Sequence, residues 1–127
     1  MEWWNKKERK TQTMSKIMQL TVRVRPYYKK SLKADFPAIG GNLSYLNEAW
    51  IEEGPSLFDI VGKLDKLLYD LEGNPPFRKI LLKHQDKLRK LHNEVEEHIA
   101  DWKLAKADQA LYQIEDVFEQ IEWELGS

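Results

Sequence analysis

The three histidines of this sequence are the residues whose spacing could bind a metal ion. His84, His92 and His98 all fall in one predicted helix, and Glu96 stands four residues after His92, so these two side chains could face one ion. A carboxylate-bridged di-iron bundle requires a glutamate three residues before a histidine. No histidine in this chain has one. We therefore expect neither a metal site nor another cofactor.

A second candidate is the pair formed by Arg78 and His84 in the stretch "RKILLKH". Its Arg-x5-His spacing resembles that of the higher-eukaryote-and-prokaryote nucleotide-binding helical domains, some of which cut RNA, and the resemblance implies a helical ribonuclease. However, residues six apart on a regular helix lie about 120° from one another. The polar residue usual right after the arginine is Lys79 here. We keep the ribonuclease as the weakest of three functional hypotheses.

No other catalytic motif is present. Gly40-Gly41 lacks the Gly-Lys-Ser/Thr sequence of a phosphate-binding loop, and no serine has a histidine partner. The many paired carboxylates belong to strongly charged helices, where such groups are normally solvated. The chain has no cysteine, which rules out disulfides and thiolate chemistry and fits a reducing compartment. The sequence thus predicts a cytoplasmic protein that is not an enzyme.

The strongest candidate for a functional site is the basic and aromatic stretch "VRVRPYYKK", residues 22–30. Its cations and tyrosines could bind phosphates and stack on exposed bases. Arginine and tyrosine are equally the favoured anchors for an acidic protein partner. The predicted partner-binding residues of this stretch are Arg23, Arg25, Tyr27, Tyr28, Lys29 and Lys30.

Three tryptophans extend the set of predicted partner-binding residues. Trp3 and Trp4 stand near two lysines and could lie at a lipid surface. A membrane is nevertheless the least favoured partner, given the balanced charge of the chain. No apolar run approaches the roughly 20 residues of a membrane span either. Trp123 falls on the outer face of the last predicted helix, about 200° from Ile121. It is either covered by the N-terminal third or left as a contact site, for which homodimerisation is the natural use.

Charge is distributed unevenly along the chain, although the net charge is only −1. Residues 1–33 carry ten cations against two acids, and residues 94–127 carry ten acids against two cations. We therefore favour an interpretation in which the basic N-terminal third packs along the acidic last helix. A protein partner comes next. Nucleic acid follows, because a dedicated nucleic-acid module usually has a net basic charge.

The last helix, predicted over residues 104–125, has the clearest pattern. Apolar residues recur at alternating spacings of 3 and 4, which is the seam of a helix that packs on another helix. The seam consists of Leu104, Ala107, Leu111, Ile114, Phe118, Ile121 and Leu125.

Two further amphipathic helices precede it. One is capped by Asn74 and begins with two prolines, runs for about 25 residues, and carries an apolar stripe as far as Trp102. The other is predicted from Pro55 to Gly73. The connection between them is too short for anything but antiparallel neighbours, so these helices must share one core.

The first 54 residues are harder to assign. A stripe through Met14 and Ile17, extended to Thr21 and Val24, favours a helix that Pro26 breaks or kinks. The stretch "LTVRVR" also alternates as a strand does, but no other segment offers a strand to pair with it.

After this segment, the sequence predicts a connection over residues 35–42. A short helix that starts at Asn42 or Ser44 and ends at Gly54 should follow it.

We predict one all-α domain over residues 1–127, an antiparallel (up-and-down) bundle of about four main helices with a kinked basic N-terminal segment. Residues 1–34 form the basic, partly flexible segment and residues 43–125 the bundle core. The function hypothesis is a small non-catalytic binding or adaptor protein, a regulator or chaperone-like protein that acts through charged and aromatic helix surfaces. The alternative is a nucleic-acid-associated, antitoxin-like regulator that uses residues 22–30.

Overall fold

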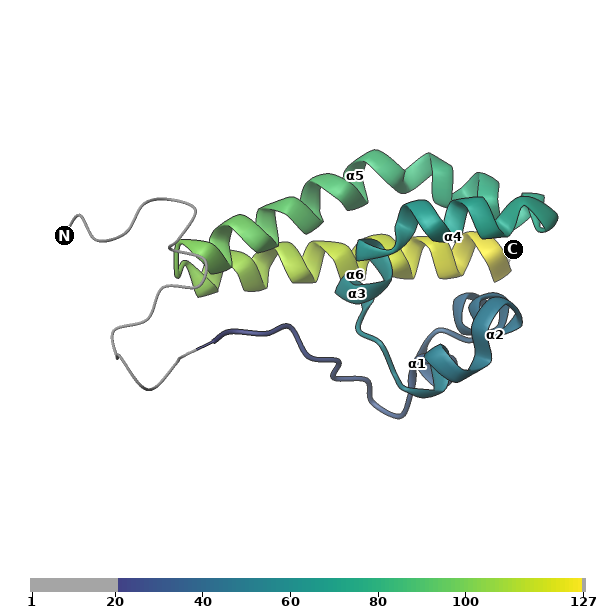
Figure 1. The fold of residues 1–127 in the computed structure, drawn as a ribbon, viewed down its shortest axis with the longest axis horizontal. Helices are drawn as coiled ribbons and strands as arrows, with labels where there is room; N and C mark the ends of the chain where they lie inside the picture. The colour runs from purple at the N-terminus through teal and green to yellow at the C-terminus, as the bar shows by residue number, and fades with distance from the viewer. Residues whose placement is uncertain (1–20, 127) are drawn as a thin grey trace.

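The computed structural model describes residues 21–126, which form helices and connections without a β-strand. The all-α class predicted from the sequence is confirmed. Figure 1 shows two long helices side by side, with the shorter helices gathered toward one end of the pair. In chain order the elements are α1 (Leu32–Asp35), α2 (Pro37–Glu52), α3 (Leu57–Gly62), α4 (Leu64–Asp70), the 3₁₀ turn η2 (Leu71–Gly73), α5 (Pro75–Ala100) and α6 (Leu104–Gly126).

The antiparallel helices α5 and α6 form the longest part of the core (Figure 1). The predicted seam of α6 is confirmed at its centre, where Ile114 and Ile121 are buried in one core with Leu88 and Val95 of α5. Burial of one such side chain contributes about 1.5–3 kcal/mol. Leu104, the predicted first residue of the seam, does not belong to the buried part, because it is 45 % exposed.

The start of α5 agrees with the prediction in position but not in detail. Asn74 occupies the position before the helix, and the two prolines follow in the first turn, where a missing N–H loses no hydrogen bond. The Asn74 side chain does not cap the helix; instead its Nδ2 donates to Asn42 Oδ1 at 2.6 Å. This residue therefore joins α5 to α2.

The turn between α5 and α6 is built around Trp102, which has the left-handed backbone conformation with φ 58°. Lys103 N donates to His98 O at 2.7 Å, and Trp102 N donates to Ile99 O at 3.0 Å, which is the bond pattern of a Schellman motif. α5 ends at Ala100, so the predicted extension of its apolar stripe to Trp102 is wrong, and that side chain is 45 % exposed.

The helix predicted over residues 55–73 is interrupted. α3 begins with a capping box, in which Ser56 Oγ accepts from Asp59 N at 3.0 Å and Asp59 Oδ2 accepts from Ser56 N at 3.1 Å. It ends at Gly62, where a Cβ atom would lie 3.3 Å from His92 Nε2 of α5. Glycine favours an interruption here because it has a low helix propensity and permits this close approach.

The connection predicted over residues 35–42 is wrong, because α2 begins at Pro37. Proline is compatible with the first turn of a helix, so it starts this helix rather than preventing it. Gly40 serves close packing: a Cβ atom there would lie 2.8 Å from Lys33 Cα of α1. The predicted short helix exists but begins before Asn42.

The helix predicted through Thr21 and Val24 is wrong within the described residues. Residues 21–28 are non-helical and run as an elongated trace, drawn in dark purple in Figure 1. The earlier part of that predicted helix, with Met14 and Ile17, lies outside the described residues.

Candidate functional site

The basic segment, which we define as residues 22–30, lies on the bundle with alternating exposure. Val22 and Val24 are half-buried, whereas Arg23 and Arg25 are exposed. Val24 also packs against the hydrophobic core. A period of two is that of an extended chain with one side on a surface. The valines therefore attach the segment to the bundle, and the arginines remain in solvent.

Tyr28 fixes the end of this extended stretch. Its hydroxyl donates to Pro55 O at 2.5 Å, and its ring packs against the core. Burial, followed by the negative charges of Asp59 and Asp35, raises the pKa of Tyr28, so the phenol keeps its proton and continues to donate. Beside it, Lys29 N donates to Asp35 Oδ2 at 2.7 Å. The backbone of the basic segment is thus held at this end.

The cationic side chains of the basic segment are not held in this way. All four are exposed, and none of them forms an ion pair in the part of the chain that the structure describes. The Tyr27 side chain is 100 % exposed. One predicted partner-binding residue of this segment, Tyr28, packs against the core instead. The others face solvent: Arg23, Arg25, Tyr27, Lys29 and Lys30.

A groove of about 540 Å³ lies between the basic segment and α6. Residues 24–29 line it on one side, and apolar side chains line it at Leu57, Leu111 and Ile114. α6 also contributes the carboxylates of Glu115 and Glu119. This volume is in the range of binding clefts in proteins. Cations from the basic segment and acids from α6 thus border the same groove.

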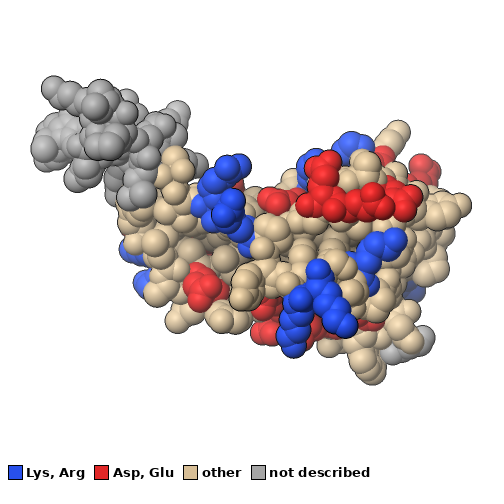
Figure 2. Space-filling view, turned by 90° about the horizontal axis from the view of Figure 1, so that it is seen from below, with Lys and Arg blue, Asp and Glu red and all other residues tan. Residues whose placement is uncertain are grey.

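The acids of α6 that border the groove are crowded. Desolvation, followed by the like charges of Glu119, Asp116 and Asp108, raises the pKa of Glu115. Figure 2 shows acidic and basic side chains gathered in separate patches on the face seen from below. The sequence shows these acids as part of the acidic last helix, but it gives no sign that two of them border the groove, because that position depends on tertiary packing.

Among the described residues, no cation of residues 21–33 forms an ion pair with α6, so the predicted pairing of the basic N-terminal third with the acidic last helix stays a prediction. α6 instead bonds to residues that follow this third. The carboxylate of Glu122 accepts hydrogen bonds from Ala38 N at 2.7 Å and from Ile39 N at 2.9 Å. Both amides lie in the first turn of α2, where an N–H group has no acceptor within the helix. The N-cap residue Phe36 supplies no side-chain hydrogen bond. α6 thus contacts the start of α2, beyond the basic third, through backbone amides.

The predicted tryptophan contacts are only partly described. Trp123 lies on α6 with 68 % of its side chain exposed, and Tyr112 is 61 % exposed on the same helix. Residues 11 apart lie about 20° from one another on a regular helix, so both share one face of α6. Trp3 and Trp4 lie outside the described residues.

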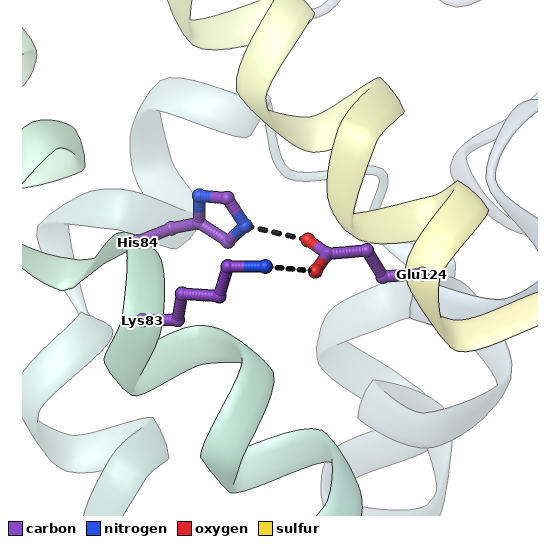
Figure 3. A network of polar contacts seen from close by, with 3 residues as sticks. All are labelled: Lys83, His84 and Glu124. Carbon is purple, nitrogen blue, oxygen red and sulfur yellow. Dashed lines mark hydrogen bonds and ion pairs between the residues drawn. The ribbon is translucent and has the colours of Figure 1, made fainter.

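Arg78 and His84 contact different parts of the fold. Arg78 Nε donates to Leu68 O near the end of α4 at 2.9 Å. Figure 3 shows the other residue, His84, directed at the carboxylate of Glu124 on α6 together with Lys83. His84 Nε2 lies 2.7 Å from Glu124 Oε1, and Lys83 Nζ lies 2.5 Å from Glu124 Oε2. The ribonuclease hypothesis stays a prediction, and both side chains contribute to helix packing.

His92 also makes contacts within the bundle. Its ring stacks on Phe58 with centroids 4.1 Å apart and an interplanar angle of 7°, and its Nδ1 lies 3.5 Å from Glu96 Oε1. The predicted proximity of His92 and Glu96 is therefore correct. Within residues 21–126, no group of three or more histidine, aspartate or glutamate side chains lies close enough together to hold a metal ion.

No family model, curated protein or solved structure matches the chain. Among the described helices, none combines the length and the apolar character needed to cross a bilayer.

Proposed function

We propose that this protein is a small, non-catalytic binding protein whose basic segment holds an acidic segment of a partner protein. One observation carries the proposal: the backbone of this segment is fixed to the bundle, while its cations and Tyr27 face solvent and form no ion pair with any residue from 21 to 126. A backbone that is already fixed loses little further conformational freedom on binding, and arginine and tyrosine are favoured anchors at protein interfaces. The chain has no cysteine, which fits the reducing cytoplasm as its place of action.

Two features favour a protein partner over a nucleic acid. The net charge of the chain is −1, whereas nucleic-acid modules are usually basic. In addition, Glu115 and Glu119 border the same groove as the cations, and they repel a continuous chain of phosphates. A protein segment can place its acids beside the arginines and apolar residues in the groove.

Binding of a short fluorescent peptide of alternating glutamate and valine, followed by anisotropy, tests this proposal. We expect the double variant Arg23→Glu/Arg25→Glu to bind at least about tenfold more weakly than the wild-type protein, because it reverses the charges next to the peptide. The matched control is Lys87→Glu/Lys90→Glu, which reverses two exposed charges on α5 and should leave the affinity unchanged.

A single-stranded oligothymidine of similar length serves as the competing ligand. If it binds more tightly than the peptide, and its affinity falls steeply with salt, the nucleic-acid alternative replaces the proposal. Failure of the wild-type protein to bind the peptide, or equal losses in both double variants, also contradicts it.

A further inference from the structure

We propose that the acidic partner segment binds by strand addition, pairing its backbone with that of Arg23, Arg25 and Tyr27. This inference rests on the proposed function and specifies the partner's chemistry: an extended segment in which acidic and apolar residues alternate. It requires an unpaired and accessible backbone, an edge that offers donors without interruption, and side chains that select the charge of the partner.

The backbone of residues 21–27 is unpaired. None of its N–H or C=O groups forms a hydrogen bond with another residue of the described chain. The stretch is nonetheless elongated, and Val24 and Tyr28 hold it against the core. An elongated segment with unpaired backbone groups is a template for an added strand. The charged side chains of Arg23 and Arg25 oppose indiscriminate pairing with apolar strands.

Pro26 determines which edge of the segment can pair. In an extended chain, successive residues direct their N–H and C=O groups to opposite edges. The edge shared by Val22, Val24 and Pro26 lacks a donor at the proline. The other edge, formed by Arg23, Arg25 and Tyr27, has all its donors. We therefore assign strand addition to the second edge.

Two of the hollows that adjoin the segment provide room for another chain. One is the groove of about 540 Å³ described above. The other, of about 260 Å³, is lined by residues 22–24 together with Phe58 of α3 and Ile99 of α5. Both have apolar side chains in their lining, so an added strand can direct alternate apolar residues toward the bundle.

The side chains of the segment select an acidic partner. Arg23 and Arg25 are both exposed and two residues apart, so they lie on one face of the extended chain. Residues directly opposite them on an added strand are stabilised if they carry the opposite charge and destabilised if they carry the same charge. A second copy of this segment in a symmetric antiparallel pair would place arginines opposite arginines, which disfavours self-pairing.

Amide hydrogen exchange measured by NMR, with the glutamate–valine peptide bound to the full chain, tests this geometry. We expect the peptide to slow exchange of the Arg23, Arg25 and Tyr27 amides by at least about tenfold, because these donors become hydrogen-bonded. The Val22 and Val24 amides lie on the other edge and should be unaffected.

Two N-methylated versions of the peptide supply a matched control. Methylation of alternate amides along the pairing edge of the peptide should weaken binding at least about tenfold. Methylation of the intervening amides preserves every side chain and charge and should leave the affinity unchanged. The difference between the two peptides reports backbone pairing alone.

The possible failures are distinct. If the peptide binds and depends on Arg23 and Arg25, but the alternate amides are not protected or both methylated peptides bind equally, strand addition is wrong and the proposed function stands. If the peptide does not bind at all, both fail. Protection of the same amides that rises with protein concentration in the absence of peptide would replace the acidic partner with a second copy of the chain.

Discussion

Glu122 joins the first and last parts of the described chain through a single carboxylate. It accepts from the amides of Ala38 and Ile39, which would otherwise lack a partner at the start of α2. A negative charge is also favoured at this end of a helix by the helix dipole. The side chain is half-buried, so these bonds are less screened by water than surface contacts are.

We expect Glu122→Ala to lower the free energy of unfolding by about 1–3 kcal/mol, because two amides lose a charged acceptor. Urea denaturation at neutral pH measures this change. Gln120→Ala alters an exposed residue on the same turn of α6 and should change the value by less than about 0.5 kcal/mol. Equal effects of the two substitutions would show that Glu122 does not cap α2.

At the residue scale, the sequence indicates which side chains are exposed, but it does not indicate which groups they bond to within the fold. The exposed positions of Arg23 and Arg25 follow from a charged, alternating pattern. Tyr28 was predicted to contact a partner, but it bonds to Pro55 O within the chain. Nothing in the sequence near Glu122 indicates that its carboxylate bonds to amides 84 and 83 positions away, because only the packing of α2 on α6 creates that contact.

At the scale of elements, the long helices were predictable because their apolar periodicity continues over many turns and their connection is short. α2 was not predictable, since its first five residues contain Pro37 and Gly40-Gly41, which are common in connections. In addition, Glu122 supplies its cap from another helix. The two glycines of α2 differ in environment. Gly40 is in close contact with α1, whereas a Cβ atom at Gly41 would meet nothing within 4 Å.

This difference gives a paired prediction. Gly40→Ala should lower the free energy of unfolding by about 1–3 kcal/mol, because the added methyl group overlaps Lys33 Cα. Gly41→Ala should raise it by about 0.5–1 kcal/mol, because alanine has the higher helix propensity and meets no obstacle. Thermal denaturation of both variants checks the signs. A stabilising effect of Gly40→Ala would contradict the close packing of α1 on α2.

At the scale of the whole molecule, segregated charge acts in two opposite ways. The charged form of Glu124 is stabilised in the fold, because hydrogen bonds from Lys83 and His84 hold its pKa below its ordinary value of 4.5. The charged form of Glu115 is destabilised in the fold, because desolvation and neighbouring acids raise its pKa. The sequence predicted the uneven distribution of charge, but only the fold shows which acids meet cations and which meet one another.

The lowered pKa of Glu124 predicts part of the acid sensitivity of the protein. Its stabilising contribution is fully present above its pKa in the unfolded chain and is lost as pH falls through the lower pKa of the folded protein. Glu124→Gln should therefore reduce the free energy of unfolding at pH 7 and flatten its decrease on acidification. Urea denaturation over a pH series measures both. An unchanged pH profile would show that the link between α5 and α6 contributes nothing.

Glu115 should respond with the opposite sign. A raised pKa means that the folded protein binds the proton more tightly than the unfolded chain, so this carboxylate destabilises the fold at neutral pH, and the penalty disappears as pH falls through the folded-state pKa. Glu115→Gln should raise the free energy of unfolding at pH 7. The same denaturation series measures it, and a loss of stability would contradict the repulsion inferred for α6.

The Glu122 contact also constrains the order in which the chain can fold during synthesis. A ribosome adds Ala38 and Ile39 long before it adds the glutamate that accepts their hydrogen bonds, 84 and 83 positions later. Until that point, the beginning of α2 has only water as an acceptor for these amides. The first turn of α2 therefore completes its hydrogen bonds only after the ribosome has added Glu122.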